Sequence, residues 1–156
     1  GCQVVAFDPD PAAAKRALEF GAAHSLSSLE ELEDRLKAVT DGRGADLCLE
    51  LSGAKSAAEL ALSLPRIGGK AVWAGTTSPM GALEVSPEVI VRRLLTLKGV
   101  HNYAPQDLSV ALDFLTRAHR KWPFASLTAH TFSLADIAEA FAAAERLPGA
   151  RVLVRP

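Results

Sequence analysis

The sequence predicts an α/β fold in which a doubly wound, mainly parallel sheet is covered by helices on both faces. Short apolar runs, which indicate buried strands, alternate with longer segments whose apolar residues recur every three or four positions, as on one face of a helix. Glycines, prolines and helix-capping residues separate the two kinds of segment. Strands and helices that alternate in this way are joined by right-handed crossovers, which make neighbouring strands parallel.

The predicted strands are short and apolar. The first ends at Asp8, and Gly68 with Gly69 is expected to turn the chain into the strand that begins at Lys70. The strands expected from these patterns are residues 4–7, 22–26, 46–51, 70–75, 96–100, 128–132 and 151–154.

Capping residues mark where helices begin and end. Asp10 is expected to cap a helix that starts at Pro11, where a missing N–H costs nothing, and that ends at Gly21. Ser28 and Glu31 have the spacing of a capping box. Further helices are expected at residues 29–39, 86–95 and 134–145, after the strand at 46–51 and after the strand at 96–100. The predicted buried face of the helix after residues 46–51 is Ala57, Leu60, Ala61 and Leu64, and the longer helix after residues 96–100 is marked by Leu108, Ala111, Leu112 and Leu115.

The composition is that of an ordinary globular domain. The 156 residues are 49% apolar and 22% charged, with a net charge of -1. There is no basic surplus to favour nucleic acid, and no apolar run is long enough to cross a membrane. Cys2 and Cys48 are far apart, which fits a reduced chain better than a disulfide framework. We therefore expect one soluble, cytoplasmic domain over residues 1–156.

Ligands of open parallel sheets bind at the carboxyl ends of the strands. The candidate residues are therefore Asp8 and the segments 50–54, 75–77 and 100–103. An acidic side chain at the end of the second strand of a dinucleotide-binding domain accepts hydrogen bonds from ribose hydroxyls and repels the 2′-phosphate of NADP. Asp8 could instead help to cap the next helix, but Asp10 already fills that role, so we favour the ribose interpretation.

Small residues follow two of the predicted strands. Ser52-Gly53 and Gly75 would let a cofactor approach the backbone closely, although ordinary turn glycines are nearly as plausible an interpretation on spacing alone. The histidines and cysteines show no metal-ligand spacing, and no nucleophile elbow is present. We expect no zinc to be bound by these residues.

Several stretches resemble zinc-type medium-chain alcohol dehydrogenases. The segment from Val4 to Asp8, followed by residues 15–22, is similar to the second strand and helix of that family's Rossmann-like domain. Stretches that match in the same order over essentially the whole chain are residues 44–53, 66–75, 97–103 and 132–141.

The resemblance implies an NAD-binding domain of an oxidoreductase that moves a hydride between an alcohol and the nicotinamide. Asp8 would hold the adenosine ribose, and Arg151 would reach the pyrophosphate. Ser52, Gly53, Trp73, Ala74 and Gly75 would flank the cofactor, and Val100, His101 and Asn102 would lie beside its nicotinamide half. The family also pairs subunits through a sheet edge that corresponds to the segment from Ala82 to Val89. The resemblance therefore implies a homodimer.

The resemblance also implies parts that these residues do not include. Family members carry a first strand with a G-x-G-x-x-G turn before the point that corresponds to Gly1, and an upstream catalytic domain with the zinc ligands. We therefore expect a domain incomplete at its N-terminal end, with unpaired strand edges, that does not catalyse hydride transfer alone. Two alternatives stay open: a non-catalytic nucleotide-binding or dimerising remnant, and an S-adenosylmethionine methyltransferase, which the single closing strand disfavours.

Overall fold

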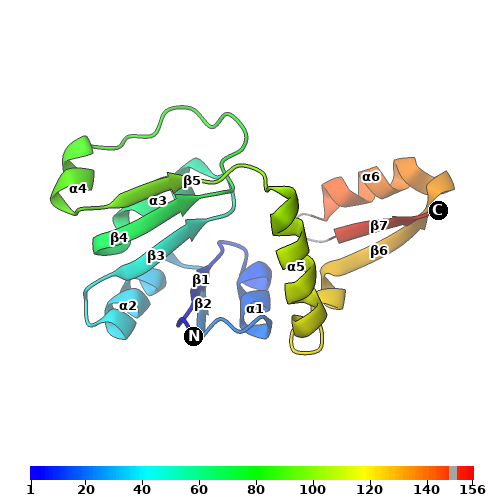
Figure 1. Ribbon diagram of the computed structural model, residues 1–156, viewed down its shortest axis with the longest axis horizontal. Coiled ribbons are helices and arrows are strands. Elements are labelled where there is room, and N and C mark those ends of the chain that lie inside the picture. Colours follow the sequence, from blue (N-terminus) through cyan, green and yellow to red (C-terminus); the bar gives the residue numbers. More distant parts are fainter. Residues whose placement is uncertain (148–150) are drawn as a thin grey trace. The chain divides into compact units, whose positions relative to one another are not determined.

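The structure, a computed structural model, describes residues 1–147 and 151–156. The chain divides into two compact units, one formed by Gly1–Ser27 together with Pro105–Pro156 and the other by Ser28–Ala104. Helices and strands alternate along most of the chain, as the sequence predicts (Figure 1). That the whole chain is a single dinucleotide-binding domain stays a prediction.

The unit formed by the two chain ends contains two pairs of parallel strands. β1 (Val5–Phe7) pairs with β2 (His24–Leu26), and α1 (Pro11–Glu19) connects them. β6 (Thr128–Ser133) pairs with β7 (Arg151–Arg155). The remaining elements of this unit are α5 (Pro105–Ala118), α6 (Ile137–Arg146) and the short 3-10 helices η1 (Phe124–Leu127) and η2 (Leu134–Asp136).

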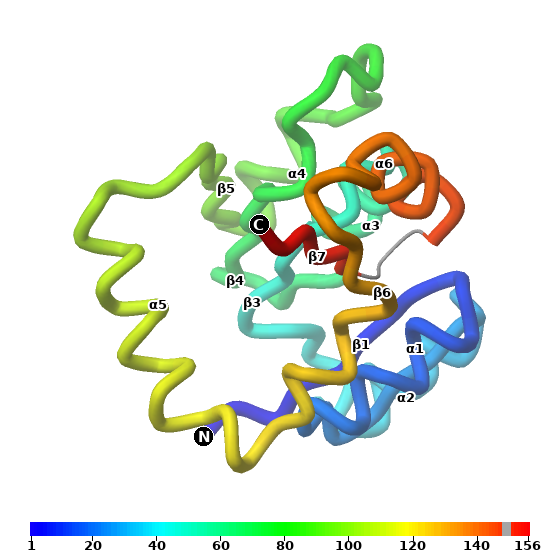
Figure 2. Tube along the Cα trace, turned by 90° about the vertical axis from the view of Figure 1, so that its right-hand side faces the viewer, coloured from blue at the N-terminus to red at the C-terminus, as the bar shows by residue number. Residues whose placement is uncertain are grey.

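The other unit contains a three-stranded parallel sheet. Its strand order is β3 (Ala45–Glu50), β4 (Pro65–Trp73), β5 (Thr96–Gly99), with β4 in the middle. Its helices are α2 (Leu29–Thr40), α3 (Lys55–Ser63) and α4 (Pro87–Arg92). A long excursion without helix or strand separates β4 from α4, and it can be followed in Figures 1 and 2. All strand pairs are parallel, as predicted, but β1 and β3 each have a single neighbour within the described residues.

The helix-capping predictions are confirmed. The side chain of Asp10 accepts a hydrogen bond of 2.9 Å from the backbone N–H of Ala12, and Pro11 is the first residue of α1. Gly21 follows the end of α1 with a φ of 91°, a conformation that side chains rarely adopt. The Ser28 hydroxyl accepts the N–H of Glu31 at 3.5 Å. These features are local, which is why the sequence alone predicts them.

The predicted buried face of α3 is wrong by about one position. The helix buries Ala58, Ala61 and Leu62, whereas Ala57, Leu60 and Leu64 are only half-buried. The sheet sets this orientation, because α3 contacts both β3 and β4. The indole N–H of Trp73, on β4, also donates a hydrogen bond of 3.2 Å to the carbonyl oxygen of Ala58.

The predicted stripe of α5 is not a buried face. Leu108, Leu112 and Leu115 are 40–56% exposed, and Ala118 is the one residue of the helix that is buried. The helical periodicity is therefore correct, but no other part of the described residues covers this face.

Gly68 and Gly69 do not precede β4 but lie within it. The register with β3 shifts between the pairs Ala45–Pro65 and Leu47–Lys70, so extra residues of β4 bulge out of the ladder. Gly68 has a φ of 73° in this bulge, which glycine tolerates best.

The segment near residues 82–89, predicted as a sheet edge, contains no strand. Residues 82–86 belong to no helix or strand, and α4 begins at Pro87. The helix ends at Arg92, earlier than predicted, and Leu94 takes a left-handed conformation with a φ of 51°. β5 is the edge strand of this sheet on that side. The homodimer stays a prediction, and residues 82–89 form no strand through which two subunits could pair.

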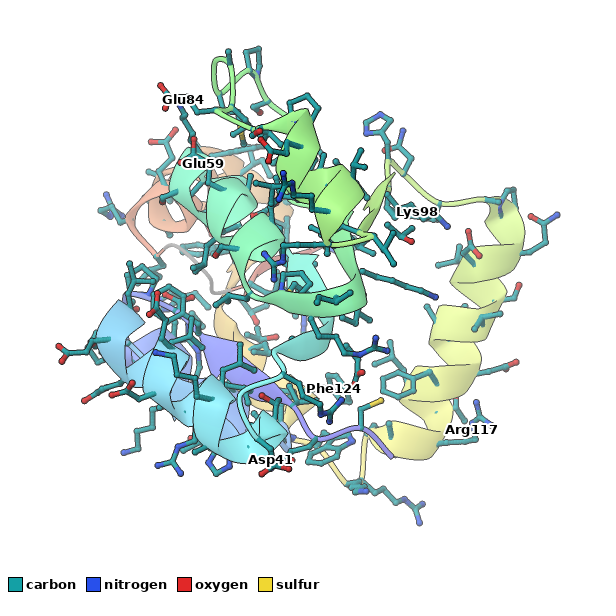
Figure 3. The ribbon with its side chains drawn as sticks, turned by 90° about the vertical axis from the view of Figure 1, so that its left-hand side faces the viewer. Asp41, Glu59, Glu84, Lys98, Arg117 and Phe124 are labelled. Atoms are coloured by element: carbon teal, nitrogen blue, oxygen red, sulfur yellow. The ribbon has the colours of Figure 1, made fainter. Side chains whose placement is uncertain are left out.

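Aromatic residues join the two chain segments of the first unit. Phe124, labelled in Figure 3, packs edge-on against Phe20 at a ring-centroid distance of 5.4 Å and against Phe114 at 6.2 Å. Gly21 lies against the ring of Trp122, where a Cβ atom would come within 2.2 Å of the ring. The N-terminal α1 is thereby docked onto the segment that follows α5.

Candidate functional site

The carboxyl ends of β3 and β4 are joined through Glu50, the last residue of β3. Its carbonyl oxygen accepts the N–H of Ala74 at 2.9 Å and the N–H of Gly75 at 3.0 Å. These bonds hold the residues that follow β4 against the end of β3. The two strand ends are therefore hydrogen-bonded directly to each other.

The side chain of Glu50 is only 2% exposed, although it carries a carboxyl group. Its Oε1 accepts three hydrogen bonds: from the N–H of Ser52 at 2.7 Å, from the Ser52 hydroxyl at 2.9 Å and from the N–H of Gly53 at 2.7 Å. Its Oε2 is buried and has no hydrogen-bond partner within the described residues. The Ser52 hydroxyl in turn accepts the N–H of Ala54 at 3.1 Å. One carboxylate oxygen thus fixes the turn between β3 and α3.

Gly53 and Gly75 cross at a distance that excludes any side chain. A Cβ atom on Gly53 would lie 2.6 Å from the carbonyl oxygen of Gly75. One on Gly75 would lie 2.3 Å from the carbonyl carbon of Leu51 and 2.5 Å from the amide nitrogens of Ser52 and Gly53. Close backbone approach explains why both positions are glycine, and Gly53 also has a φ of 77° in the turn that follows β3, so the choice between a cofactor contact and a turn glycine stays open.

A cavity of about 340 Å³ opens at the carboxyl ends of β4 and β5. Its lining residues come from the ends of these strands: Trp73, Thr76, Thr77, Gly99, Val100 and His101. The N–H of Val100 donates to the carbonyl oxygen of Trp73 at 2.8 Å, which extends the pairing of the two strands to the edge of the cavity. Asn102 has a φ of 56°, and its Nδ2 lies 3.1 Å from Nε2 of His101.

Most of the predicted site residues come together here. Ser52, Gly53, Gly75, Val100 and His101 lie at one end of the three-stranded sheet, and Asn102 follows directly. Thr76 and Thr77, in the predicted segment 75–77, add hydroxyl groups to the lining.

Asp8 and Arg151 belong to the other unit. The backbone N–H of Asp8 donates to the carbonyl oxygen of Leu26 at 3.1 Å, which extends the β1–β2 ladder. Its Oδ1 accepts the N–H of Asp10 at 2.9 Å, so Asp8 also supports the turn into α1. Arg151 is the exposed first residue of β7 and pairs with Thr128.

A second cavity, of about 290 Å³, lies at the opposite end of the sheet. Lys37, Arg43 and Arg93 give it a basic lining, together with Gly44 and Pro65 from the amino ends of β3 and β4. Arg93 is already engaged there, because its guanidinium donates to the carbonyl oxygens of Leu62 at 3.3 Å and Ser63 at 3.0 Å. This end of a parallel sheet is not where ligands bind in such folds.

Cys48 is not an available nucleophile. The residue lies on β3, and burial raises the pKa of its thiol from 9.0 to about 11, against a smaller opposing effect of Arg93. Because the thiolate is the reactive form, little reactive Cys48 exists at neutral pH. Since the folded-state pKa is raised, the thiol contributes stability below pH 9 that is lost as the pH rises toward 11.

This difference is measurable with a thiol reagent at pH 8. In the Cys2→Ser variant, we expect Cys48 to react about 100-fold more slowly than Cys2 does in the Cys48→Ser variant, because Cys2 is exposed. Unfolding in denaturant is the control, since both thiols should then react at similar rates. Similar rates in the folded variants would contradict the burial of Cys48.

Neither a metal cluster nor a membrane span is found in the described part of the chain. It holds no group of three or more His, Cys, Asp or Glu side chains placed to bind a metal ion, so these residues do not fit a zinc site. None of the described helices has the length and apolar character needed to cross a bilayer.

Parallel strands joined by helices, with a cavity at the carboxyl ends of β4 and β5, are the arrangement in which open α/β sheets bind ligands. A family model described as zinc-binding dehydrogenase matches residues 1–117. The chain belongs to this zinc-binding dehydrogenase family. Membership of this family excludes the alternative that the chain is an S-adenosylmethionine methyltransferase.

Two curated relatives are a dehydrogenase and a reductase by name. The chain is 27% identical over 143 residues to a sorbitol dehydrogenase of Halalkalibacterium halodurans, which covers 91% of this chain and 41% of the relative. It is also 27% identical over 132 residues to a D-xylulose reductase of Saccharomyces cerevisiae, covering 80% and 35%. The chain thus spans less than half the length of these relatives.

A solved structure confirms the fold class. An alcohol dehydrogenase of Thermotoga maritima superposes with a TM-score of 0.92 at 25% identity, over 100% of this chain and 44% of that one. The chain therefore has the Rossmann-like fold of the nucleotide-binding part of alcohol dehydrogenases.

Proposed function

We propose that the chain is the C-terminal, nucleotide-binding portion of an NAD-dependent zinc-type alcohol or polyol dehydrogenase, which transfers a hydride between an alcohol and the nicotinamide. The observation that carries this proposal is the crossing of Gly53 and Gly75 next to the cavity at Val100 and His101. The two glycines let the ends of β3 and β4 meet directly beside the cavity, at the edge where open α/β sheets bind ligands. The alcohol and polyol dehydrogenases among the relatives support the substrate class.

In the proposed complex, different residues contact different parts of the cofactor. Val100, His101 and Asn102 contact the nicotinamide half, and Ser52, Gly53 and Gly75 flank the middle of the cofactor. Neither the N–H nor the hydroxyl of Ser52 is free to donate to the cofactor, because both donate to Glu50. Arg151 binds the pyrophosphate, for which its exposed guanidinium is suited.

Asp8 selects NAD over NADP in the proposed complex. Its Oδ1 is engaged by the N–H of Asp10, whereas no described residue donates to its Oδ2. That oxygen is therefore open to a ribose hydroxyl, and the negative charge disfavours a 2′-phosphate.

Catalysis requires groups beyond these residues. We propose that zinc ligands and a glycine-rich phosphate turn are supplied by further sequence or by a partner chain, and that residues 1–156 alone do not turn over alcohols. Every described strand except β4 has a single neighbour, so β1 and β3 each keep a free backbone edge to which a further strand can pair. The alternative is a remnant that has lost cofactor binding.

Titration with NADH and NADPH separates these possibilities. The 156-residue chain is expected to bind NADH saturably and NADPH at least about tenfold more weakly, because Asp8 repels the phosphate. In Asp8→Asn the two affinities should approach each other, while Glu139→Gln, an exposed carboxylate on α6, serves as the control. Absence of saturable NADH binding would favour the remnant, and unchanged selectivity in Asp8→Asn would contradict the role of Asp8.

A further inference from the structure

Glu50 is the one buried charged or polar residue of the described core, and the chemistry proposed so far does not use it. A buried carboxylate is costly unless its oxygens are hydrogen-bonded. Here Oε1 takes three hydrogen bonds, Oε2 takes none, and no described Lys, Arg or His forms an ion pair with the group. Such an arrangement calls for an explanation beyond packing.

The hydrogen bonds of Glu50 reach both sides of the glycine crossing. Its side chain holds Ser52 and Gly53, and its backbone carbonyl holds Ala74 and Gly75. Because Gly53 and Gly75 touch, a displacement of the Ser52–Gly53 turn must displace the residues after Gly75 as well. Those residues, Thr76 and Thr77, line the cavity. The position of the Glu50 carboxylate therefore determines where Thr76 and Thr77 lie in the lining of the cavity.

The electrostatic surroundings also suit a carboxylate. The turn that Glu50 holds leads directly into α3, whose N-cap residue, Ala54, makes no side-chain capping bond. A negative charge near the N-terminus of a helix is favourable, because the first amide groups carry partial positive charge. The amides of Ser52 and Gly53, which precede the helix, donate to Oε1 and so hold the carboxylate close to this end of α3.

We propose that Glu50 is a positioning residue for cofactor binding: its carboxylate holds the turn of residues 51–54 against Gly75 and thereby places the backbone on which the dinucleotide lies. This inference rests on the proposed function. It assigns to Glu50 a role through geometry and not through direct contact with the cofactor, since its side chain is buried.

Two substitutions separate position from charge. Glu50→Asp keeps the charge but withdraws the carboxylate by one methylene, so the amides of Ser52 and Gly53 lose their acceptor. Glu50→Gln keeps an oxygen at the same place and removes the charge. Glu84→Gln removes a charge from the exposed loop of the same unit, where Glu84 is labelled in Figure 3, and is the matched control.

NADH titration of the 156-residue chain, followed by nicotinamide fluorescence, tests the inference. We expect the Kd for NADH to rise about tenfold in Glu50→Asp and to stay within about threefold in Glu50→Gln and Glu84→Gln. Amide hydrogen exchange at Ser52 and Gly53 should be faster in Glu50→Asp alone, and circular dichroism at the titration temperature confirms that each variant is folded. A purely structural role would lower stability without changing the emission of bound NADH, which should shift in Glu50→Asp.

The possible outcomes are distinct. A folded Glu50→Asp that binds NADH like the wild type would overturn the role of Glu50 alone. Weaker binding by Glu50→Gln than by Glu50→Asp would show that charge and not position matters, and would also overturn it. If Glu50→Asp does not fold, Glu50→Gln still decides, because a tenfold loss there contradicts the inference. Absence of NADH binding by the wild-type chain would contradict the proposed function, and the role of Glu50 with it.

Discussion

Gly75→Ala is expected to abolish NADH binding and to destabilise the unit of residues 28–104 by about 3 kcal/mol. The added Cβ would lie 2.3–2.5 Å from backbone atoms of Leu51, Ser52 and Gly53. Backbone atoms cannot move aside as the end of a flexible side chain can. The ends of β3 and β4 must therefore separate, which breaks the hydrogen bonds that the Glu50 carbonyl accepts.

Denaturant unfolding and NADH titration measure the two effects. Gly99→Ala is the control for stability, because a Cβ on Gly99 would meet nothing within 4 Å and its backbone conformation is one that alanine adopts. We expect this control to change the free energy of unfolding by less than about 0.5 kcal/mol. A Gly75→Ala variant as stable as the wild type would mean that the two strand ends are not in the close contact described above.

Gly21→Ala is expected to destabilise the other unit by about 3 kcal/mol. Two costs add: the Cβ would overlap the ring of Trp122 at 2.2 Å, and a φ of 91° strains any residue with a side chain. The added Cβ would lie 2.2 Å and 2.7 Å from Cη2 and Cζ3 of Trp122, so the indole ring must move to accommodate it.

A double-mutant cycle with Trp122→Ala separates these costs. In the Trp122→Ala background the overlap is gone, so Gly21→Ala should cost only about 1 kcal/mol for the backbone strain. The difference between the two backgrounds, followed by thermal and denaturant unfolding, is the contribution of the contact. Equal costs in both backgrounds would show that Trp122 does not pack on Gly21.

Features that depend on neighbouring residues could be predicted from the sequence. Asp10, Pro11 and Ser28 act within one helical turn, and the structure places each as predicted. The parallel pairing also follows from the alternation of strands and helices, which is a property of the chain order. Residues 52–53, 75 and 100–101 lie at one edge because the carboxyl ends of parallel strands meet, whatever their sequence, whereas the binding of a ligand at this edge stays a prediction.

Features that depend on distant contacts could not be predicted. The buried face of α3 is set by β3 and β4, and the glycines of β4 form a bulge because of its register with β3. Periodicity showed that Leu108, Leu112 and Leu115 share a face of α5, but not that this face is exposed. Glu50 lies in the candidate segment 50–54, but its hydrogen bonds could not be predicted because they form where residues 52–53 meet residues 74–75. An acidic residue at the end of an apolar strand and before a small-residue turn was the available signal.

The most direct test of the proposed dinucleotide site is a ¹⁵N–¹H chemical-shift titration of the chain with NADH. We expect the largest amide shifts to fall on Asp8, Ser52, Gly53 and Gly75, and on residues 100–102 after β5. Shifts confined to the opposite cavity, at Lys37 and Arg43, or no saturable shifts at all, would contradict the claim that a dinucleotide binds at the carboxyl ends of these strands.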